Sequence, residues 1–499
     1  MTERISAREA IALVTDSFAE LPSLSEEFRS DGPLSWKGYG EARVRAAART
    51  GEEESVVCGA ATFGTASFGT TTDGRAPLGP VTAVLIAFEF GFLGGSLGER
   101  TGDRLEAAYD YARTHRLPVV SLVATGGSRM QEGMLALTQL QRVARQSALT
   151  REAGLAQIAV LRDPTTGGGW ATLGAGADVT LALPGAQVAF AGSRVRPPDA
   201  DPAAYTAEAQ VAAGSVDALV PQDGLRETLA LWLDLLTRPA AGAAPVTPAL
   251  GPASVPPSLG PVPVPSALGG ASVPPAKGGA SDLPAKGGAS DLPATGWDAV
   301  QRARSPERPR AEAYLDAYFT RRAAISGDRC GGTDDGVLCG FGRTSDGRTI
   351  AYAAQRGTPT RPAGYRTAAR LVRLAGRLGI PVLTLVDTPG AANGADAERQ
   401  GAGAAIADLF AAVATARTPV TTLVIGEGGS GGALALAAPG NTWATPDSYF
   451  SVIAPESAAA ILKRPADEVR ATAAQLRLRP QDLLDLGVIR GIAQRRPGP

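Results

Sequence analysis

Histidine is almost missing from this sequence of 499 residues, because His115 is the only one. An enzyme with this composition must take its acid–base groups from carboxylates, from the substrate or from a cofactor. His115 itself stands in the polar run YARTHRLPVV, near the expected end of a helix, where an imidazole on the surface is the simplest interpretation.

Cysteine is also scarce. Cys58, Cys330 and Cys339 form no CxxC pair and no set that could surround a tetrahedral metal ion. We interpret them as small apolar residues in a reducing compartment, and we expect no metal site.

The chain has no excess of charge and no long apolar run. Its formal net charge of −1 gives no electrostatic reason to expect nucleic-acid binding. No apolar stretch reaches the ~18 residues of a membrane span, and the first residues, MTERISAREA, lack the apolar region of a signal peptide. The expectation is a cytoplasmic globular protein without membrane association.

Two pairs of similar segments indicate a duplicated domain. LPVVSLVATGG (Leu117–Gly127) and IPVLTLVDTPG (Ile380–Gly390) share six of eleven residues at an offset of 263. Near the same offset, DVTLALPGAQVAFAG begins at Asp178 and NTWATPDSYFSVIAP at Asn441. Two matches in register favour two related domains. In each copy, an apolar strand runs into small residues and then a helix, which exposes main-chain N–H groups.

The composition divides the chain into four parts. Residues 1–55 are expected to be a helical N-terminal segment, and residues 56–238 the first domain. Residues 239–296 are rich in Pro, Gly and Ala and contain the repeats GGASVPPAK, GGASDLPAK and GGASDLPAT, which predict a disordered linker. Residues 297–499 are the second domain. Strands alternate with helices in both domains, which predicts an α/β fold. Helices are expected near Asp103–His115, Ala311–Ile325 and Tyr365–Leu378.

Three glycine motifs have competing interpretations. DTPG at Asp387–Gly390 and GEGGSG at Gly426–Gly431 resemble nucleotide-binding loops, but no Lys follows the second. GGSGG around Ser430 matches a nucleophile elbow, but no histidine lies downstream of that serine. The remaining alternatives for the paired glycines are tight turns with close packing, or oxyanion holes built from main-chain N–H groups.

Together, the two halves resemble the beta and alpha carboxyltransferase subunits of bacterial acetyl-CoA carboxylase, joined in one chain. The beta-like motifs are AFEFGFLGGSLGER (Ala87–Arg100), ATGGSRMQEG (Ala124–Gly133), DPTTGG (Asp163–Gly168) and FAGSRV (Phe190–Val195). The alpha-like motifs are AGYRTAARL (Ala363–Leu371), VDTPGA (Val386–Ala391), IGEGGSGGALAL (Ile425–Leu436) and FSVIAPE (Phe450–Glu456).

This resemblance implies an α/β protein of two crotonase-like domains, each a ββα superhelix, related by duplication and joined by the linker. The family transfers a carboxyl group from carboxybiotin to acetyl-CoA, which gives malonyl-CoA, and propionyl-CoA is a possible second acceptor. The beta-like domain would bind the acyl-CoA and the alpha-like domain the carboxybiotin. The resemblance also assigns oxyanion stabilisation to Gly126 and Gly127 in the first domain and to Gly431 and Gly432 in the second. Residues expected to line the cofactor sites are Gly94, Gly95, Ser96, Arg129, Gly167, Gly168, Gly390, Ala391, Gly428 and Gly429.

The expected partners follow from what the sequence does not contain. No MKM biotin-attachment motif and no ATP-grasp segment are visible, so a biotin carboxyl carrier protein and a biotin carboxylase are expected as separate chains. Self-association, at least to a dimer, is implied by the family. Trp170, Asn393 and the segment from Arg196 depart from the family pattern, and Trp170 could narrow the CoA channel. The alternatives are a non-catalytic assembly subunit and another crotonase-type CoA enzyme.

Overall fold

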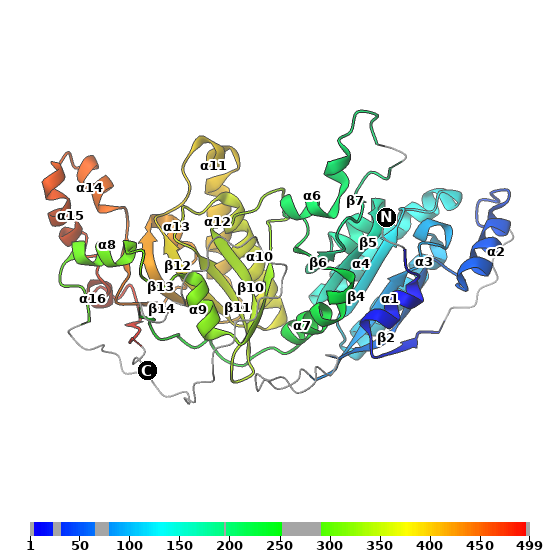
Figure 1. Cartoon of the computed structure of the whole chain (residues 1–499), viewed down its shortest axis with the longest axis horizontal. Helices are drawn as coiled ribbons and strands as arrows, with labels where there is room; N and C mark the ends of the chain where they lie inside the picture. Colours follow the sequence, from blue (N-terminus) through cyan, green and yellow to red (C-terminus); the bar gives the residue numbers. More distant parts are fainter. Residues whose placement is uncertain (1–3, 23–30, 65–78, 194–195, 252–290, 496–499) are drawn as a thin grey trace. The chain divides into compact units, whose positions relative to one another are not determined.

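The computed structural model describes residues 4–22, 31–64, 79–193, 196–251 and 291–495 (Figure 1). The chain divides into two compact units. Unit 1 contains Met1–Thr237 with Arg329–Gly331, and unit 2 contains Arg238–Asp328 and Gly332–Pro499. Each unit is built around one mixed sheet.

The sheet of unit 1 has the order β1-β2-β3-β4-β5-β6-β8, with β7 paired to β5. The bounds are β1 (Ser17–Glu20), β2 (Val56–Phe63), β3 (Val81–Phe88), β4 (Val119–Thr125), β5 (Gln157–Thr166), β6 (Val179–Ala182), β7 (Val188–Ala189) and β8 (Ala218–Leu219). The helices are α1 (Ala7–Val14), α2 (Tyr39–Thr50), α3 (Glu99–His115), α4 (Gly133–Glu152), α5 (Gly167–Gly169), α6 (Ala207–Ala212) and α7 (Leu225–Thr237).

The sheet of unit 2 has the order β16-β14-β13-β12-β11-β10-β9, with β15 paired to β13. The bounds are β9 (Arg321–Ile325), β10 (Val337–Arg343), β11 (Thr349–Gln355), β12 (Val382–Thr388), β13 (Val420–Gly429), β14 (Thr442–Ala444), β15 (Tyr449–Ser451) and β16 (Gly491–Ile492). The helices are α8 (Gly296–Arg304), α9 (Ala311–Tyr318), α10 (Pro362–Leu378), α11 (Ala395–Arg399), α12 (Ala402–Ala414), α13 (Ser430–Leu434), α14 (Pro455–Ile461), α15 (Val469–Gln475) and α16 (Pro480–Asp485).

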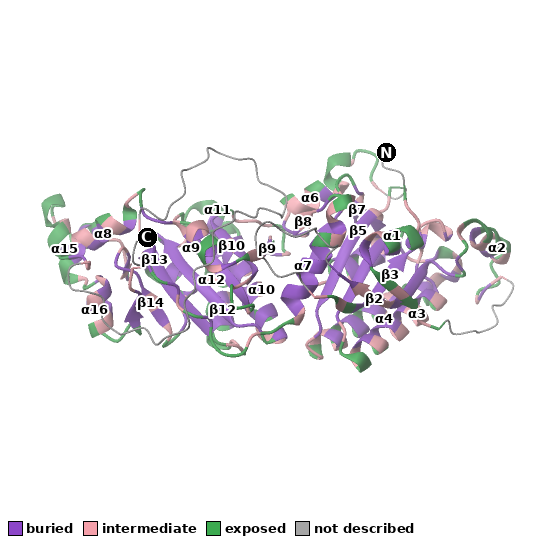
Figure 2. Cartoon of the chain, turned by 60° about the horizontal axis from the view of Figure 1, so that its bottom comes forward, coloured by how far each residue is buried: buried purple, intermediate pink, exposed green. Residues whose placement is uncertain are grey.

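The core of each unit lies around its central parallel strands. Every residue of β4 and of β12 is buried, and Figure 2 shows the strands of both sheets coloured as buried. Strands covered on both faces carry nearly continuous apolar runs, which explains VVSLVAT and VLTLVDT. In unit 2, α10 begins with Pro362 in its first turn and stops at Gly379, whose φ of 72° only glycine adopts easily.

The two units share one topology, strand for strand. β4 and β12 begin at Val119 and Val382, and β5 and β13 keep the same offset along their whole lengths. Both pairs also contain a register shift at the same place, between Val123 and Thr125 in unit 1 and between Val386 and Thr388 in unit 2. The duplication predicted from the sequence is therefore visible in the structure, and positions of one unit can be compared directly with those of the other.

Two expected elements near the start of each unit were wrong. Residues 17–20, expected within a helical segment, form β1, which pairs antiparallel with β2 and belongs to unit 1. The helix expected over Ala311–Ile325 ends at Tyr318, and RRAAI (residues 321–325) forms β9 at the edge of the second sheet. In both cases, pairing with a neighbouring strand decides the structure of a short segment with weak local preference.

The expected linker is shorter than predicted, because both of its ends are part of unit 2. Leu250 N–H donates to the Tyr314 hydroxyl (3.2 Å), and Thr421 Oγ1 donates to Ala244 O (2.9 Å). At the other end, Arg495 Nε lies 2.7 Å from Asp291 Oδ2. Residues 252–290, which contain the repeats, lie outside the described residues.

We expect residues 252–290 to be dispensable for activity, since both flanking segments are attached to the same unit. Replacing them with a Gly–Ser segment of about eight residues should leave the activity of the chain unchanged. The free energy of unfolding should rise by at most about 1.5 kcal/mol, because a shorter connection costs less entropy to close. Calorimetry and an activity assay of the full chain test this. A large loss of activity with unchanged melting would show that the segment has a role of its own.

Candidate functional site

The turn after β4 contains the first predicted oxyanion pair. Gly126 is exposed, and Gly127 is buried with a φ of 109°. Gly126 N–H donates to Gly94 O (2.9 Å), and Gly127 N–H donates to Thr125 Oγ1 (3.0 Å). Both N–H groups are therefore used inside unit 1. The structure does not support their predicted role as the donors to a substrate oxygen.

The turn after β12 repeats this geometry. Gly390 has a φ of 140°, and its N–H donates to Thr388 Oγ1 (3.1 Å), as Gly127 does to Thr125. The next residues, Ser128 in unit 1 and Ala391 in unit 2, form equivalent parallel bridges with Leu97 and Thr360. Within the described residues, the N–H groups of Ser128 and Ala391 have no hydrogen-bond partner. An N–H group at each turn thus remains available, one residue beyond the predicted pair in unit 1.

A second pair of equivalent turns follows β5 and β13. Gly167 (φ 64°) and Ser430 (φ 58°) occupy the same position, so Gly168 and Gly169 correspond to Gly431 and Gly432. The predicted catalytic glycines of the two halves are therefore not equivalent to each other, because Gly126 and Gly127 come from the other turn.

These second turns differ in how open they are. A Cβ on Gly168 would lie 2.3 Å from Leu140 Cδ2, whereas a Cβ on Gly431 would meet no atom within 4 Å. Gly431 and Gly432 also lie in the first turn of α13, where a helix leaves main-chain N–H groups without intrahelical acceptors. The turn at Gly431 is the accessible one.

In unit 2 the two turns meet. A Cβ on Gly432 would lie 2.5 Å from Ala391 N and 3.0 Å from Gly390 C, so the start of α13 packs directly on the turn after β12. Gly429 approaches the other side of that turn, where a Cβ would lie 2.0 Å from Pro389 O. The available N–H of Ala391 and the start of α13 therefore form one small site whose walls are main chain.

Other predicted site glycines serve packing. A Cβ on Gly95 would lie 2.1 Å from Ala124 O, one on Gly167 3.1 Å from the Gly127 Cα, and one on Gly428 2.5 Å from the Phe450 ring. Gly94 contributes its carbonyl to Gly126. Gly95, Gly167 and Gly428 allow close approach of neighbouring segments, and Gly94 helps to build the turn after β4.

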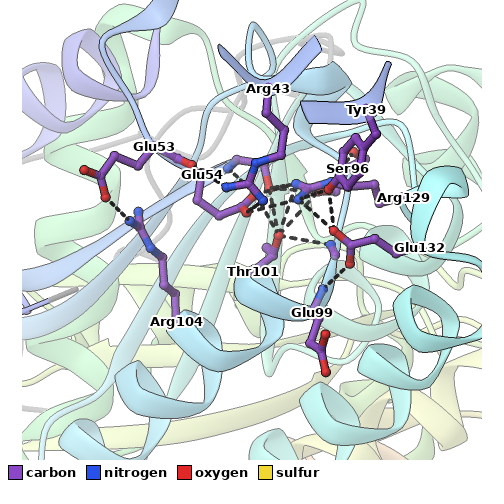
Figure 3. Close-up of polar contacts among 12 residues, drawn as sticks. Tyr39, Arg43, Glu53, Glu54, Ser96, Glu99, Thr101, Arg104, Arg129 and Glu132 are labelled. Carbon is purple, nitrogen blue, oxygen red and sulfur yellow. Dashed lines mark hydrogen bonds and ion pairs between the residues drawn. The ribbon is translucent and has the colours of Figure 1, made fainter. Parts of the chain in front are cut away.

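Arg129, predicted to contact the cofactor, is buried in an ion-pair cluster (Figure 3). Its guanidinium pairs bidentately with Glu54, with Nη1 3.0 Å from Oε2, and Nη1 lies 3.4 Å from Glu132 Oε1. Arg129 Nε donates to Ser96 Oγ (3.2 Å) and Nη2 to Ser96 O (2.7 Å). Tyr39 donates its hydroxyl to Glu132. Arg129 and Ser96 therefore hold the turns of unit 1 together, and the structure does not support a phosphate-binding role for the arginine.

The charge state of this cluster depends on Arg129. Burial alone raises the pKa of Glu54, but the Arg129 guanidinium more than offsets this effect and holds the pKa at about 2. Burial raises the pKa of Tyr39 to about 12, so Tyr39 stays a neutral donor. Glu54 and Arg129 are thus a charged pair at neutral pH.

The lowered pKa of Glu54 makes unit 1 sensitive to acid. The stabilisation is present above the pKa of about 4.5 that an unfolded chain has, and it is lost as pH falls toward about 2. A shift of this size corresponds to roughly 3 kcal/mol. Calorimetry between pH 7 and pH 2 should show this loss, and Glu54→Gln should flatten the pH dependence while lowering stability at pH 7. An unchanged slope in the variant would contradict the assignment.

Asp387 of the DTPG motif has a structural role. Its carboxylate is buried, accepts from Arg308 Nη2 (2.6 Å) and from Glu427 N–H (3.2 Å), and lies 3.3 Å from Arg310 Nη1. The arrangement ties the end of β12 to β13 and so fixes the turn that carries Ala391.

The sequence also singled out Trp170, His115 and Ser430. Trp170 is buried in the apolar core cluster of unit 1, which also contains Leu173. His115 is exposed and stacks on Tyr111 with ring centroids 3.8 Å apart. Ser430, in unit 2, therefore has no histidine beside it within that unit.

The described part of the chain contains no helix long and apolar enough to cross a membrane. Nor, in the same residues, do three or more His, Cys, Asp or Glu side chains gather as metal ligands would.

Two family models match the chain. The acetyl co-enzyme A carboxylase carboxyltransferase-like model matches residues 292–498, and the carboxyl transferase domain model matches residues 74–218. These ranges fall in unit 2 and unit 1 respectively.

Similar proteins extend over nearly the whole sequence. The acetyl-coenzyme A carboxylase carboxyl transferase subunits beta/alpha of Salinispora arenicola are 36% identical over 97% of this chain and 81% of theirs. A probable biotin-dependent acyl-coenzyme A carboxylase beta3 subunit of Mycobacterium tuberculosis is 33% identical over 91% of this chain and 83% of its own. Among solved structures, the hexameric transcarboxylase 12S with methylmalonyl-coenzyme A bound covers 98% of this chain and 86% of its own, with a TM-score of 0.70 at 19% identity. That likeness shows the fold, which is crotonase-like in both units.

Proposed function

The chain belongs to the family of acetyl-coenzyme A carboxylase carboxyl transferase subunits and is a carboxyltransferase, and we propose that it carboxylates acetyl-CoA at the expense of carboxybiotin on a separate carrier protein. In this reaction the N–C bond of carboxybiotin breaks and a C–C bond forms at the α-carbon of the acyl group. The α-proton passes to the biotin nitrogen, and the products are malonyl-CoA and biotin. Propionyl-CoA is a second acceptor in this proposal.

One observation carries the proposal: at equivalent turns, Ser128 in unit 1 and Ala391 in unit 2 each have a main-chain N–H that finds no hydrogen-bond partner among the described residues. Removing the α-proton of a thioester places negative charge on its carbonyl oxygen, and loss of the carboxyl group places it on the biotin carbonyl oxygen. Each oxygen needs fixed hydrogen-bond donors, and one such donor contributes about 3 kcal/mol in a transition state. Two anionic oxygens and two equivalent turns fit one another.

We assign the acyl-CoA thioester to unit 1, at the turn of Gly126–Ser128, and carboxybiotin to unit 2, at Ala391 and Gly431. Carboxybiotin supplies the carboxyl group and the base, so the residues of the chain need supply only orientation and electrostatic stabilisation. A reaction whose base comes from carboxybiotin needs no histidine at the turns, and none is present there. The turn of unit 2 leaves room for a ligand, because a Cβ on Gly431 would meet no atom within 4 Å.

The partners in this proposal are a biotin carboxyl carrier protein, a biotin carboxylase and further copies of this chain. The transcarboxylase 12S assembles as a hexamer, and the carrier is proposed because the sequence contains no MKM motif. Size-exclusion chromatography with light scattering tests the self-association.

The test of the activity is a substrate panel. The purified chain is mixed with a biotin carboxylase, its biotinylated carrier, ATP and bicarbonate, and then with acetyl-, propionyl- or butyryl-CoA. We expect malonyl-CoA as the main product and methylmalonyl-CoA at a lower rate. Carboxylation of none of the three would contradict the proposal, and it would favour a non-catalytic assembly subunit.

A further inference from the structure

Tyr365 is a buried phenol beside the unit 2 site whose hydroxyl lacks a partner. The residue lies in the first turn of α10 and is 1% exposed. Its oxygen and Ala391 N both lie 2.5 Å from the position that a Cβ on Gly432 would take. Among the described residues, the hydroxyl oxygen makes no hydrogen bond of good geometry, and the Thr360 side chain interacts with it without reaching that geometry. An unpaired buried hydroxyl carries a desolvation cost that a phenylalanine would avoid, so its position at the site requires a reason.

A second polar atom without a partner adjoins the same main chain. Gln355, the last residue of β11, donates its Nε2 to Thr360 Oγ1 (3.1 Å) and toward Gly432 O (3.5 Å). Its Oε1 is buried and, among the residues described, accepts no hydrogen bond. Gln355, Thr360 and Tyr365 therefore form a polar group directly behind the turn of Ala391 and the start of α13.

Unit 1 shows that the fold itself does not require these side chains. The strand register places Phe88 where unit 2 has Gln355, because Val56 pairs with Phe88 as Val337 pairs with Gln355. The equivalent bridges place Leu97 at the position of Thr360. The helices α3 and α10 both have 17 residues, and Gly102 stands at the position of Tyr365. Apolar residues or a glycine thus occupy, in unit 1, the three positions equivalent to these polar residues of unit 2.

We propose that Tyr365, with Gln355 and Thr360, is a positioning residue for the anionic oxygen bound by unit 2. Among the described residues its buried hydroxyl has no hydrogen bond of good geometry, which is unfavourable. A ligand oxygen with developing negative charge binds at Ala391 N–H. The phenol of Tyr365 then holds the main chain of Ala391 and Gly432 in place around that oxygen. The inference rests on the proposed function, and it assigns the polar group to the carboxybiotin half of the reaction and not to the acyl-CoA half.

Tyr365→Phe is the test, and Tyr314→Phe is the matched control. Tyr314 is an equally buried tyrosine of unit 2 whose oxygen accepts from Leu250 N–H (3.2 Å). Losing that acceptor should lower the melting temperature and leave kcat unchanged. Tyr365→Phe should keep or raise the melting temperature, lower kcat by about tenfold or more, and leave the KM for malonyl-CoA unchanged.

The readout is carboxyl transfer from malonyl-CoA to biocytin, which needs no carrier protein. Gln355→Met keeps the length of the side chain and removes its polar atoms, and it should lower kcat in the same way. This second variant keeps the inference testable if Tyr365→Phe does not fold. A wild-type kcat in both variants, with the wild-type chain active, would overturn the inference. A wild-type chain that transfers no carboxyl group to biocytin or to a carrier would instead overturn the proposed function.

Discussion

Gly432→Ala should reduce carboxyl transfer by about 100-fold or more while the chain stays folded. The added Cβ would lie 2.5 Å from Ala391 N and from the Tyr365 hydroxyl oxygen, and 3.0 Å from Gly390 C. Two of these atoms belong to the main chain, so the turn after β12 must move. A displacement of about 1 Å at a catalytic group is enough for such a loss. Overpacking should also cost about 1–3 kcal/mol of stability.

The control for this substitution is Gly403→Ala in α12. A Cβ there would meet no atom within 4 Å, and alanine favours the helix by about 1 kcal/mol. This variant should be at least as stable as the wild type and fully active. Steady-state assays and melting curves of both variants give the comparison. Wild-type turnover in Gly432→Ala would mean that the packing of α13 on the Ala391 turn does not matter for the reaction.

Arg129→Met should destabilise unit 1 by about 3–5 kcal/mol. The methionine fills most of the arginine's volume but leaves the buried carboxylates of Glu54 and Glu132 without their cation, which is the costly way to break a buried ion pair. We expect a lowered transition in calorimetry of the full chain, together with a raised pKa of Glu54, because its largest favourable interaction is lost.

Arg142→Met provides the comparison in the same unit. Arg142 pairs with Asp103 at 2.9 Å and with Glu106, but its side chain is 35% exposed. Exposed pairs contribute about 0–1 kcal/mol, so this variant should melt close to the wild type. Equal effects of the two substitutions would show that the Arg129 cluster is not the main polar support of unit 1.

The duplication is the feature that the sequence predicted best. The shared segments after Leu117 and Ile380 lie on β4 and β12, and their identities come from full burial and from the turn that follows. Such positions constrain the residue type strongly. β1 and β9, by contrast, are short edge strands whose pairing partners are distant in sequence, so local pattern could not identify them.

The sequence predicted which turns follow the central strands, but it could not show which N–H groups at those turns are available as donors. Gly126 and Gly127 stand where expected, yet their N–H groups are bonded to Gly94 and Thr125. No residue pattern shows which way a peptide N–H points. Arg129 looked like an anion-binding residue because its burial partner, Glu54, lies 75 positions away. The sequence alone did not indicate a role for Tyr365 or Gln355. Their polar side chains stand out only against Gly102 and Phe88, the residues at the equivalent positions of unit 1.

The central claim is that a main-chain N–H at Ala391 stabilises an anionic oxygen, and the most direct measurement replaces that peptide N–H by an ester oxygen. Incorporating lactic acid at position 391 removes one donor and keeps the methyl side chain. Because this N–H has no partner among the described residues, stability should not change. The same replacement at Ala392, whose N–H donates to Thr360 O (2.8 Å), should lower stability instead. At position 391, kcat for transfer from malonyl-CoA to biocytin should fall by about 10²–10³-fold. A wild-type kcat in that ester variant would contradict the account.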